Sequence, residues 1–443
     1  MDTPIKDFVN IYAKKNKLRL HVPGHKGKDY IGVEKFDLTE IDGADCLYNA
    51  SGIIKTSQLN ASNIFNANTF YSTEGSSLSI RAMVYLALKN SKSSSPYILA
   101  GRNAHKSFIS AVGLLGLDVD WIYPNGNSYL ACDITPSLLD NTLKNLKTLP
   151  IAVYITTPDY LGNMLDVNAL SKVCKKFGVL LLVDNAHGSY LKFLEDSLHP
   201  IDLGADMCCD SAHKTLPALT GASYLHLSKD LPSTFVEQAQ NALSLFASTS
   251  PSYLILQSLD NLNAYLSKGY KEKLGGFIAE VNSLKEKLIL GGYKLIGNEP
   301  LKITLDAKAY GYLGEQLSKL LSENDIVVEF YDTDYVVLML TPELSKDDLS
   351  QLLIILLSIK RKKKIISSPP SIIRSEKVCS IRNALLSPTK KLDTRLCEGK
   401  ILGTLSVNCP PAVPILVCGE KIDKKAIERL LYYNIDYCDV LCD

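Results

Sequence analysis

The stretch from Ala205 to Ala222 reads ADMCCDSAHKTLPALTGA, and the rest of the chain is best interpreted around it. A short apolar run through Cys208 and Cys209 is followed at once by small and polar residues that include Lys214. A lysine on a small, polar turn just past an apolar run suits an amine that must react rather than merely carry charge. Lys214 is therefore our candidate nucleophile. The alternative is a solvated loop lysine, which describes most lysines, so other parts of the chain must decide.

The composition describes an ordinary globular protein. The 443 residues are 46% hydrophobic and 21% charged, enough to bury a large core and to form two or three domains. A formal net charge of +1 creates no field that would attract nucleic acid or an anionic membrane. The N-terminus lacks the apolar core of a secretory signal, and Gln351 to Ile359 is too short to span a bilayer. We expect a cytoplasmic protein with no nucleic-acid or membrane partner.

The cysteines give no sign of a cross-linked framework. There are 11 of them, scattered along the chain and without a CxxC pair. The adjacent Cys208 and Cys209 lie in the apolar run quoted above. Reduced core thiols are favoured over disulfides or a zinc site, and we expect no metal.

From Tyr71 onward, short apolar segments alternate with helical ones, after a first 70 residues that look irregular apart from a short amphipathic start. This alternation predicts an α/β fold with a mainly parallel sheet covered by helices on both faces. The expected strands are Tyr97–Gly101, Val119–Tyr123, Ile151–Thr157, Val179–Asp184, Met207–Cys209 and Ala222–Leu227.

Polar clusters follow four of these strands. Ligands of open α/β sheets bind at the carboxyl edge of the strands, so we expect the four clusters to converge on one crevice, which raises Lys214 above an ordinary loop lysine. Asp184 closes the most hydrophobic stretch, where a carboxylate is costly unless a cation pairs with it; the simpler alternative is a cap or strand-end hydrogen bond. The clusters are Arg102–Ser107, Thr156–Tyr160, Asp184–Gly188 and Ser211–Lys214.

A phosphate site is expected where Gly75 begins a helix that runs to about Asn90. Glycine and hydroxyl residues at a helix start leave free N–H groups and a positive dipole end, although a plain serine cap is the simpler interpretation. The whole set matches pyridoxal phosphate: Lys214 would form the Schiff base, and Asp184 would pair with the pyridine nitrogen. Ala186 is small enough for a flat ring to lie against it.

Several blocks, in the same order along the chain, resemble the bacterial ornithine/lysine/arginine decarboxylases of the aspartate-aminotransferase fold. The resemblance covers nearly the whole chain, and the compact length is similar to that of the shorter members from Gram-positive bacteria. The blocks are His21–Gly27, Arg102–Ser107, Asp184–Gly188, Ser211–Leu219, Ser248–Tyr253, Pro410–Pro414 and Gly419–Glu420.

The resemblance implies fold type I, with a seven-stranded large domain, a smaller α+β C-terminal part and pyridoxal phosphate as cofactor. It implies that His105 stacks on the cofactor ring, that His187 lies near the ring hydroxyl and the substrate, and that Ala186 packs on the other ring face. Thr249 or its neighbours would reach in from a partner subunit, in a homodimer or higher homo-oligomer with a shared site. The catalytic set is Lys214, His105, Asp184 and His187, and the phosphate set is Gly75, Ser76, Ser77, Ser211 and His213.

Four parts are expected along the chain. Residues 1–70 would form an N-terminal arm with site loops, and 71–262 the large cofactor-binding domain. Residues 263–365 would form a small α+β domain, with helices from Tyr253 to about Leu290. The C-terminal segment 371–443 would pack near the site.

The chain departs from the family pattern at several positions. Asn185 and Tyr190 differ within the block that begins at Asp184, and Cys46 replaces an acidic residue. Glu74 adds a negative charge beside the expected phosphate, which should disfavour binding unless this side chain points away or is paired. Ala412 and Cys418 also differ but do not touch the chemistry.

The implied reaction removes carbon dioxide from a basic amino acid, arginine before lysine or ornithine, and leaves the amine. An aminotransferase or lyase of the same fold would share Lys214 and Asp184 but release a keto acid or ammonia. A catalytically altered relative is the second alternative, supported by Glu74 and Asn185.

Overall fold

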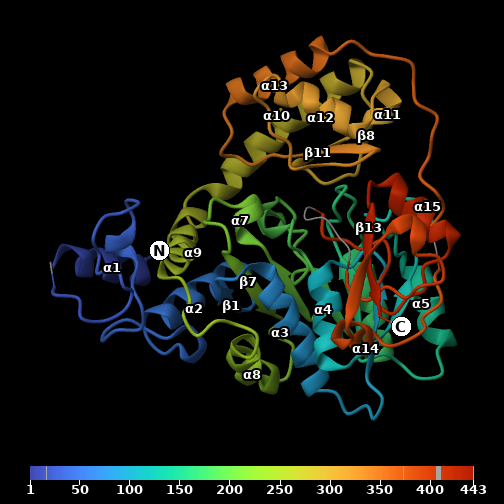
Figure 1. The fold of residues 1–443 in the computed structure, drawn as a ribbon. Coiled ribbons are helices and arrows are strands. Elements are labelled where there is room, and N and C mark those ends of the chain that lie inside the picture. The colour runs from blue at the N-terminus through green and yellow to red at the C-terminus, as the bar shows by residue number, and fades with distance from the viewer. Residues whose placement is uncertain (16, 373, 406–410, 443) are drawn as a thin grey trace. The chain divides into compact units, whose positions relative to one another are not determined.

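The computed structural model describes residues 1–443 except 16, 373, 406–410 and 443, so Pro410 lies outside the described residues (Figure 1). The chain divides into two compact units. The first unit consists of Met1–Ser94 and Val167–Leu274, and the second of Ser95–Asp166 and Gly275–Asp443.

Seven strands form one sheet in the order β1-β7-β6-β5-β4-β2-β3. The pairs β2–β3, β2–β4 and β5–β6 are parallel, whereas β7 runs antiparallel to both β1 and β6. The predicted mainly parallel α/β sheet is confirmed. The first unit supplies β1 (Asn68–Ser72), β5 (Leu180–Asp184), β6 (Met207–Asp210) and β7 (Ser223–Leu227), and the second supplies β2 (Tyr97–Gly101), β3 (Asp118–Ile122) and β4 (Ala152–Thr156).

Helices surround the strands of the first unit, and every residue of β6 and β7 is buried. Both faces of these two strands are therefore covered, as in the interior of an α/β sheet. The helices are α1 (Pro4–Lys14), α2 (Ile53–Phe65), α3 (Gly75–Lys89), α6 (Val167–Phe177), α7 (Ala212–Thr215), α8 (Ser233–Ser244) and α9 (Tyr253–Leu266).

The expectation that the first 70 residues are irregular is wrong for α2 and for β1. The buried carboxylate of Asp45 caps α2, because its Oδ2 accepts the backbone N–H groups of Gly52 at 2.7 Å and Ile54 at 3.0 Å. This cap stands several residues before the helix, outside the usual position of a capping side chain. β1 is held by antiparallel pairing with β7, which is distant in the sequence.

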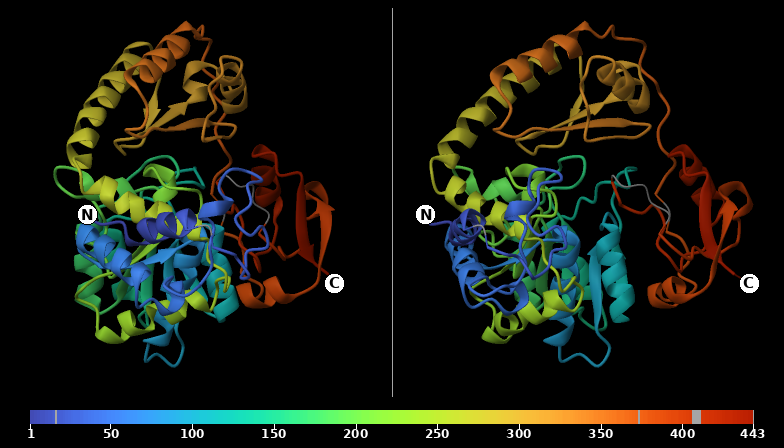
Figure 2. Two further views of the ribbon diagram at one scale, coloured as in Figure 1. Left: turned by 90° about the vertical axis from the view of Figure 1, so that its left-hand side faces the viewer. Right: turned by 60° about the vertical axis from the view of Figure 1, so that its left-hand side comes forward.

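The second unit contains β2, β3 and β4 with α4 (Lys106–Leu115) and α5 (Pro136–Asn145), and an antiparallel sheet in the order β10-β11-β9-β8. Figure 2 shows α13 beside the second half of α10 above this sheet, where Lys346 Nζ lies 2.9 Å from Glu280 Oε1. The helices expected from Tyr253 to about Leu290 are confirmed by α9 and α10. The elements of this region are β8 (Leu295–Ile296), β9 (Lys302–Asp306), β10 (Phe330–Tyr331), β11 (Tyr335–Met339), α10 (Tyr270–Leu290), α11 (Ala307–Tyr310), α12 (Gly314–Ser322) and α13 (Lys346–Ser358).

The C-terminal part of the second unit has its own apolar core, built around Leu402, Ile422, Leu430 and Val440. Its helix α14 packs closely on α4: a Cβ added at Gly113 would lie 2.5 Å from Leu385 Cδ1. Its elements are α14 (Ile381–Leu386), β12 (Thr389–Asp393), α15 (Lys424–Tyr432) and β13 (Tyr437–Leu441).

Among the described residues, no helix combines the length and the apolar character that crossing a membrane requires.

Candidate active site

Lys214 and His187 meet in the first unit. Lys214 lies in α7, a single turn directly after β6, and His187 follows β5, the parallel neighbour of β6. Lys214 Nζ lies 2.9 Å from His187 Nε2. The lysine is half-buried and the histidine is buried. Two of the four predicted polar clusters therefore meet at the carboxyl ends of β5 and β6.

Asp184 ends β5 in a buried environment, with 2% of its surface exposed. Its Oδ1 accepts the backbone N–H of Ala186 at 3.2 Å and the thiol of Cys209 at 3.5 Å. Burial, followed by the charge of Asp184, raises the pKa of Cys209 well above its usual range, so this thiol stays protonated and donates. A carboxylate buried this deeply favours a cationic partner.

The start of α3 carries the features expected of an anion site. Gly75 has a φ of +69° and donates its N–H to the carbonyl of Gly221 at 2.8 Å. No atom lies within 4 Å of where a Cβ on Gly75 would stand. Ser211 Oγ, at the end of β6, donates to Ser76 Oγ at 2.8 Å, and Ser77 is the next residue of the helix. Two hydroxyls from different elements thus adjoin the positive end of a helix of 15 residues.

Glu74 is paired within the first unit. Its Oε1 accepts the backbone N–H of Ser248 at 2.8 Å. This bond ties the loop that carries the exposed Thr249 to the residue before α3. The carboxylate that seemed unfavourable for phosphate therefore has a structural partner.

His213 is held by a backbone carbonyl. Its Nδ1 lies 2.9 Å from the carbonyl oxygen of Ala222, which can only accept, so Nδ1 carries the hydrogen. Burial first, and then the charge of Lys214, lower the pKa of His213, which favours the neutral ring. In that form Nε2 is an acceptor, so a bond from His213 to phosphate would require its protonation. The phosphate role of His213 stays a prediction.

His105 belongs to the second unit, where it caps α4. Its Nδ1 accepts the backbone N–H of Ser107 at 3.1 Å, so the other ring nitrogen carries the hydrogen in the neutral form. The neighbouring Lys106 donates its N–H to the carbonyl of Ala412 at 2.8 Å. The ring orientation is thus set by the helix start, and stacking of His105 on the cofactor stays a prediction.

Arg102 joins three of the blocks that carry the family resemblance. Its guanidinium donates to the carbonyls of Pro414 at 3.1 Å and Ile415 at 3.0 Å and to Glu420 Oε2 at 3.1 Å. Arg102 and Glu420 are both buried. The late proline block is therefore fixed to the segment after β2 by a buried ion pair and two backbone contacts.

Asn185 takes part in a buried network that the sequence did not reveal. Its Nδ2 donates to Asp210 Oδ1 at 2.7 Å, and Asp210 Oδ2 lies 3.2 Å from His199 Nε2 and 3.3 Å from His226 Nε2. Burial opposes ionisation of Asp210, but the two histidines outweigh it and hold its pKa below the usual range. The departure at Asn185 is thus accompanied by a carboxylate on the neighbouring strand. The sequence offered one sign of this network: side chains alternate between the two faces of a strand, which puts Cys208 and Asp210 on the same face of β6.

The remaining predicted positions are placed as follows. Ala186 and Tyr190 are both buried, at 9% and 0% exposure. Cys46 is exposed and directly follows Asp45, the residue that caps α2.

The chain is similar to known proteins along most of its length. The family model described as "Orn/Lys/Arg decarboxylase, major domain" matches residues 3–295. The uncharacterized protein YaaO of Bacillus subtilis is 29% identical over 97% of this chain and 94% of its own length. An arginine decarboxylase of the same organism is 27% identical, with 98% and 94% of the two chains covered.

Solved structures give the same fold. The crystal structure of a lysine decarboxylase from Francisella novicida matches with a TM-score of 0.80 and 17% identity, covering 99% of this chain and 81% of that one. With the family model covering more than half of the residues, the chain belongs to the Orn/Lys/Arg decarboxylase family and is a pyridoxal-phosphate-dependent decarboxylase.

Proposed function

We propose that the protein decarboxylates a basic amino acid, arginine before lysine or ornithine, to the corresponding amine and carbon dioxide. The observation that carries the proposal is the contact between Lys214 Nζ and His187 Nε2, 2.9 Å apart, at the strand end next to that of the buried Asp184. Arginine comes first because similar proteins from Bacillus subtilis and Halalkalibacterium halodurans are named arginine decarboxylase. Lysine follows because the similar solved structure from Francisella novicida is a lysine decarboxylase.

Pyridoxal phosphate supplies an electron-poor ring that accepts the electron pair left when the carboxylate departs. We propose that Lys214 holds this group covalently and that Asp184 pairs with its ring nitrogen. The burial of Asp184 at the end of β5 favours a cationic partner, which supports the assignment. His105 and Ala186 would take the two ring faces.

The phosphate is proposed to bind at the start of α3. The open space beside Gly75 and the contact between the Ser76 and Ser211 hydroxyls support this placement. Ser77, in the first turn of α3, adds a further hydroxyl. His213 would contribute only when protonated.

His187 is proposed to hold and return the proton of the Lys214 amine. The 2.9 Å separation of the two nitrogens allows one proton to be shared between them. Whenever the Lys214 amine is free, His187 would keep it in place and near its proton.

We also propose a homodimer with a shared site. The N-terminal arm exposes a run of large apolar side chains, including Leu18 at 83%, Leu20 at 83% and Ile31 at 81%. Several large exposed apolar side chains in one segment favour burial against another surface. The exposed Thr249 lies on a loop tied by Glu74, as suits a residue that reaches into a partner's site.

Two further assignments rest on the family and the sequence. The protein is proposed to act in the cytoplasm. The division into an arm (1–70), a cofactor domain (71–262), a small domain (263–365) and a C-terminal segment (371–443) is retained as a proposal.

The test is incubation of the protein with pyridoxal phosphate and arginine, lysine or ornithine, with carbon dioxide and amine measured separately. We expect equal amounts of both products from one of the three amino acids. Lys214→Ala should abolish release, and Lys268→Ala, which changes an exposed lysine of the same unit, should not. A keto acid or ammonia would instead indicate the aminotransferase or lyase, and no product from any substrate would indicate a catalytically altered relative.

A further inference from the structure

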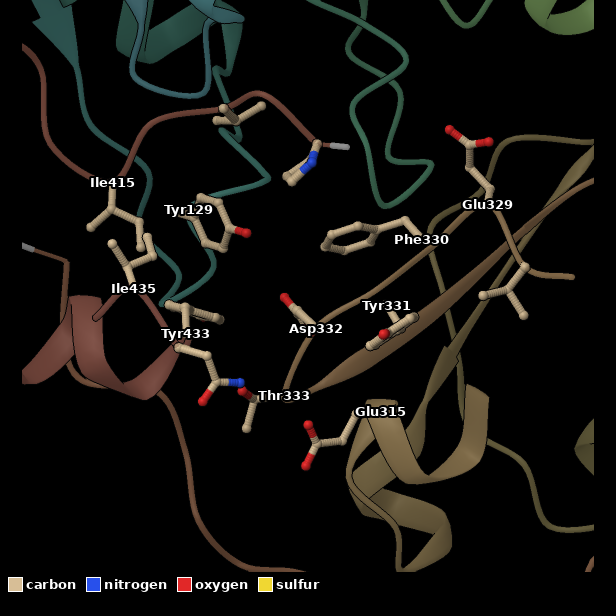
Figure 3. A pocket seen from close by; sticks show the side chains of 14 residues that line it. Tyr129, Glu315, Glu329, Phe330, Tyr331, Asp332, Thr333, Ile415, Tyr433 and Ile435 are labelled. Carbon is tan, nitrogen blue, oxygen red and sulfur yellow. The ribbon is translucent and has the colours of Figure 1, made fainter. Parts of the chain in front are cut away.

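A cavity of about 330 Å³ lies within the second unit, beside the turn between β10 and β11; we call it the β10 pocket. Its walls include Tyr129, Glu315, Glu329, Phe330, Asp332 and Tyr433, and Figure 3 shows these side chains around one space. Its volume is at the lower end of the range that holds small-molecule ligands in proteins.

The β10 pocket is acidic. Glu315, Glu329 and Asp332 line it, and its described lining residues include no lysine, arginine or histidine. The nearby Lys308 forms an ion pair with another carboxylate, because its Nζ lies 2.7 Å from Asp334 Oδ1. The lining carboxylates are therefore not neutralised by a basic side chain of the pocket wall.

Asp332 presents a buried oxygen to this space. Its Oδ1 accepts the backbone N–H groups of Asp334 at 2.7 Å and Tyr335 at 2.8 Å, which fixes the side chain. Its Oδ2 is buried and has no hydrogen-bond partner among the described residues. Figure 3 shows the carboxylate pointing into the pocket. A buried carboxylate oxygen without a donor is costly, so the arrangement favours a ligand that donates.

The geometry favours an organic cation over a metal ion. Within the described part of the chain, the only three metal-binding side chains close enough to share an ion are His199, Cys208 and Asp210, in the other unit. The three carboxylates of the pocket are thus too far apart for all of them to coordinate one ion. The ring centroids of Tyr129 and Tyr433 lie 4.7 Å apart, and the ring planes make an angle of 61°. Aromatic side chains in a pocket wall suit ammonium or guanidinium groups, which interact favourably with ring faces.

We propose that the β10 pocket binds a small organic dication with an ammonium or guanidinium group at each end, through Asp332 and the separated carboxylates of Glu315 and Glu329. This is the class of the amine that the proposed reaction releases, and the choice of ligand rests on that proposed function. The amino-acid substrate carries an additional carboxylate, which an acidic pocket repels. The pocket therefore selects product over substrate by charge.

The test is calorimetric titration of the cofactor-loaded protein with agmatine, cadaverine and putrescine, none of which can be decarboxylated. 4-Guanidinobutyrate is the matched probe, because it keeps the guanidinium of agmatine but carries a carboxylate at the other end. We expect Asp332→Asn to weaken dication binding by about tenfold or more, as loss of a bond to a charged group does. Asp325→Asn, at an exposed position outside the pocket, should leave binding unchanged.

A second pair of variants guards against misfolding of Asp332→Asn. Glu315→Gln changes an exposed pocket residue of α12, and Glu323→Gln changes an exposed residue at the end of the same helix. We expect only Glu315→Gln to weaken binding, with unchanged melting temperatures. Equal binding of agmatine and 4-guanidinobutyrate, or no effect of either pocket variant, would overturn the proposal.

The outcome is independent of the catalytic assay. Dication binding that depends on Asp332 in a protein that decarboxylates nothing would support the pocket and reject the proposed function. Decarboxylation by a protein that shows no such binding would support the proposed function and reject the pocket.

Discussion

Lys214 Nζ lies 2.9 Å from His187 Nε2, so the residues after two neighbouring parallel strands are joined at their reactive atoms. Because of this contact, two side chains that are 27 positions apart in the sequence can share one proton. It also places the amine next to a buried strand end that closes with a carboxylate, Asp184.

His187→Gln should slow the reaction without removing the cofactor. Glutamine can still hydrogen-bond to Lys214 but cannot hold a proton for it, so we expect kcat to fall by about 10²-fold. The visible absorbance of the bound cofactor should persist. Steady-state kinetics together with an absorbance spectrum check both parts, and an unchanged kcat would reject the proton-holding role.

Glu74→Gln should strengthen cofactor binding by a few fold. Glutamine keeps an acceptor for the Ser248 N–H but removes the negative charge beside the start of α3. Glu74→Ala, which also removes the acceptor, should loosen the loop with Thr249 and lose this gain. Titration of the apoprotein with pyridoxal phosphate compares the three proteins. Weaker binding by Glu74→Gln would mean that the charge itself is required.

Asp210→Asn should destabilise the first unit by about 3–5 kcal/mol, because it leaves His199 and His226 without their buried carboxylate. The pKa of Asp210 is lowered, so its contribution to stability is complete above the usual carboxyl pKa and is lost as the pH falls through the lowered value. On acidification below about pH 4, melting temperatures should therefore fall more steeply for the natural protein than for the variant. Asp230→Asn, at an exposed position, is the control.

Asp332 should change the stability of the protein with pH in the direction opposite to Asp210. Burial raises its pKa to about 7, so the folded chain holds a proton that the unfolded chain has lost between about pH 4 and pH 7. Its contribution to stability therefore declines as the pH rises across this range. We expect Asp332→Asn to melt higher than the natural protein at pH 8, by more than at pH 5. If the two proteins differed in melting temperature by the same amount at pH 5 and at pH 8, the raised pKa of Asp332 would be contradicted.

The strands and the start of α3 could be predicted because their signals are local. β2 has the predicted bounds, and Gly75 begins α3 as expected. Local patterns failed where a distant residue holds the element. The cap of α2 comes from Asp45, and the network of Asn185, Asp210 and His226 requires β6 to pair with both β5 and β7.

The β10 pocket could not be predicted for the same reason. Its walls come from five separate stretches of the chain, represented by Tyr129, Glu315, Asp332, Pro411 and Tyr433. One stretch belongs to the late proline block, but nothing in its sequence indicates a pocket, and among the described residues the unpartnered Oδ2 of Asp332 draws attention to the enclosed space.

The most direct test of the central assignment is the visible absorbance and the carbon dioxide release of Lys214→Ala beside the natural protein, both loaded with pyridoxal phosphate. We predict that the natural protein shows a cofactor band and releases carbon dioxide and amine in equal amounts from a basic amino acid. Lys214→Ala should lose both the covalent band and the release. A covalent band or product formation that survives in Lys214→Ala would contradict the assignment.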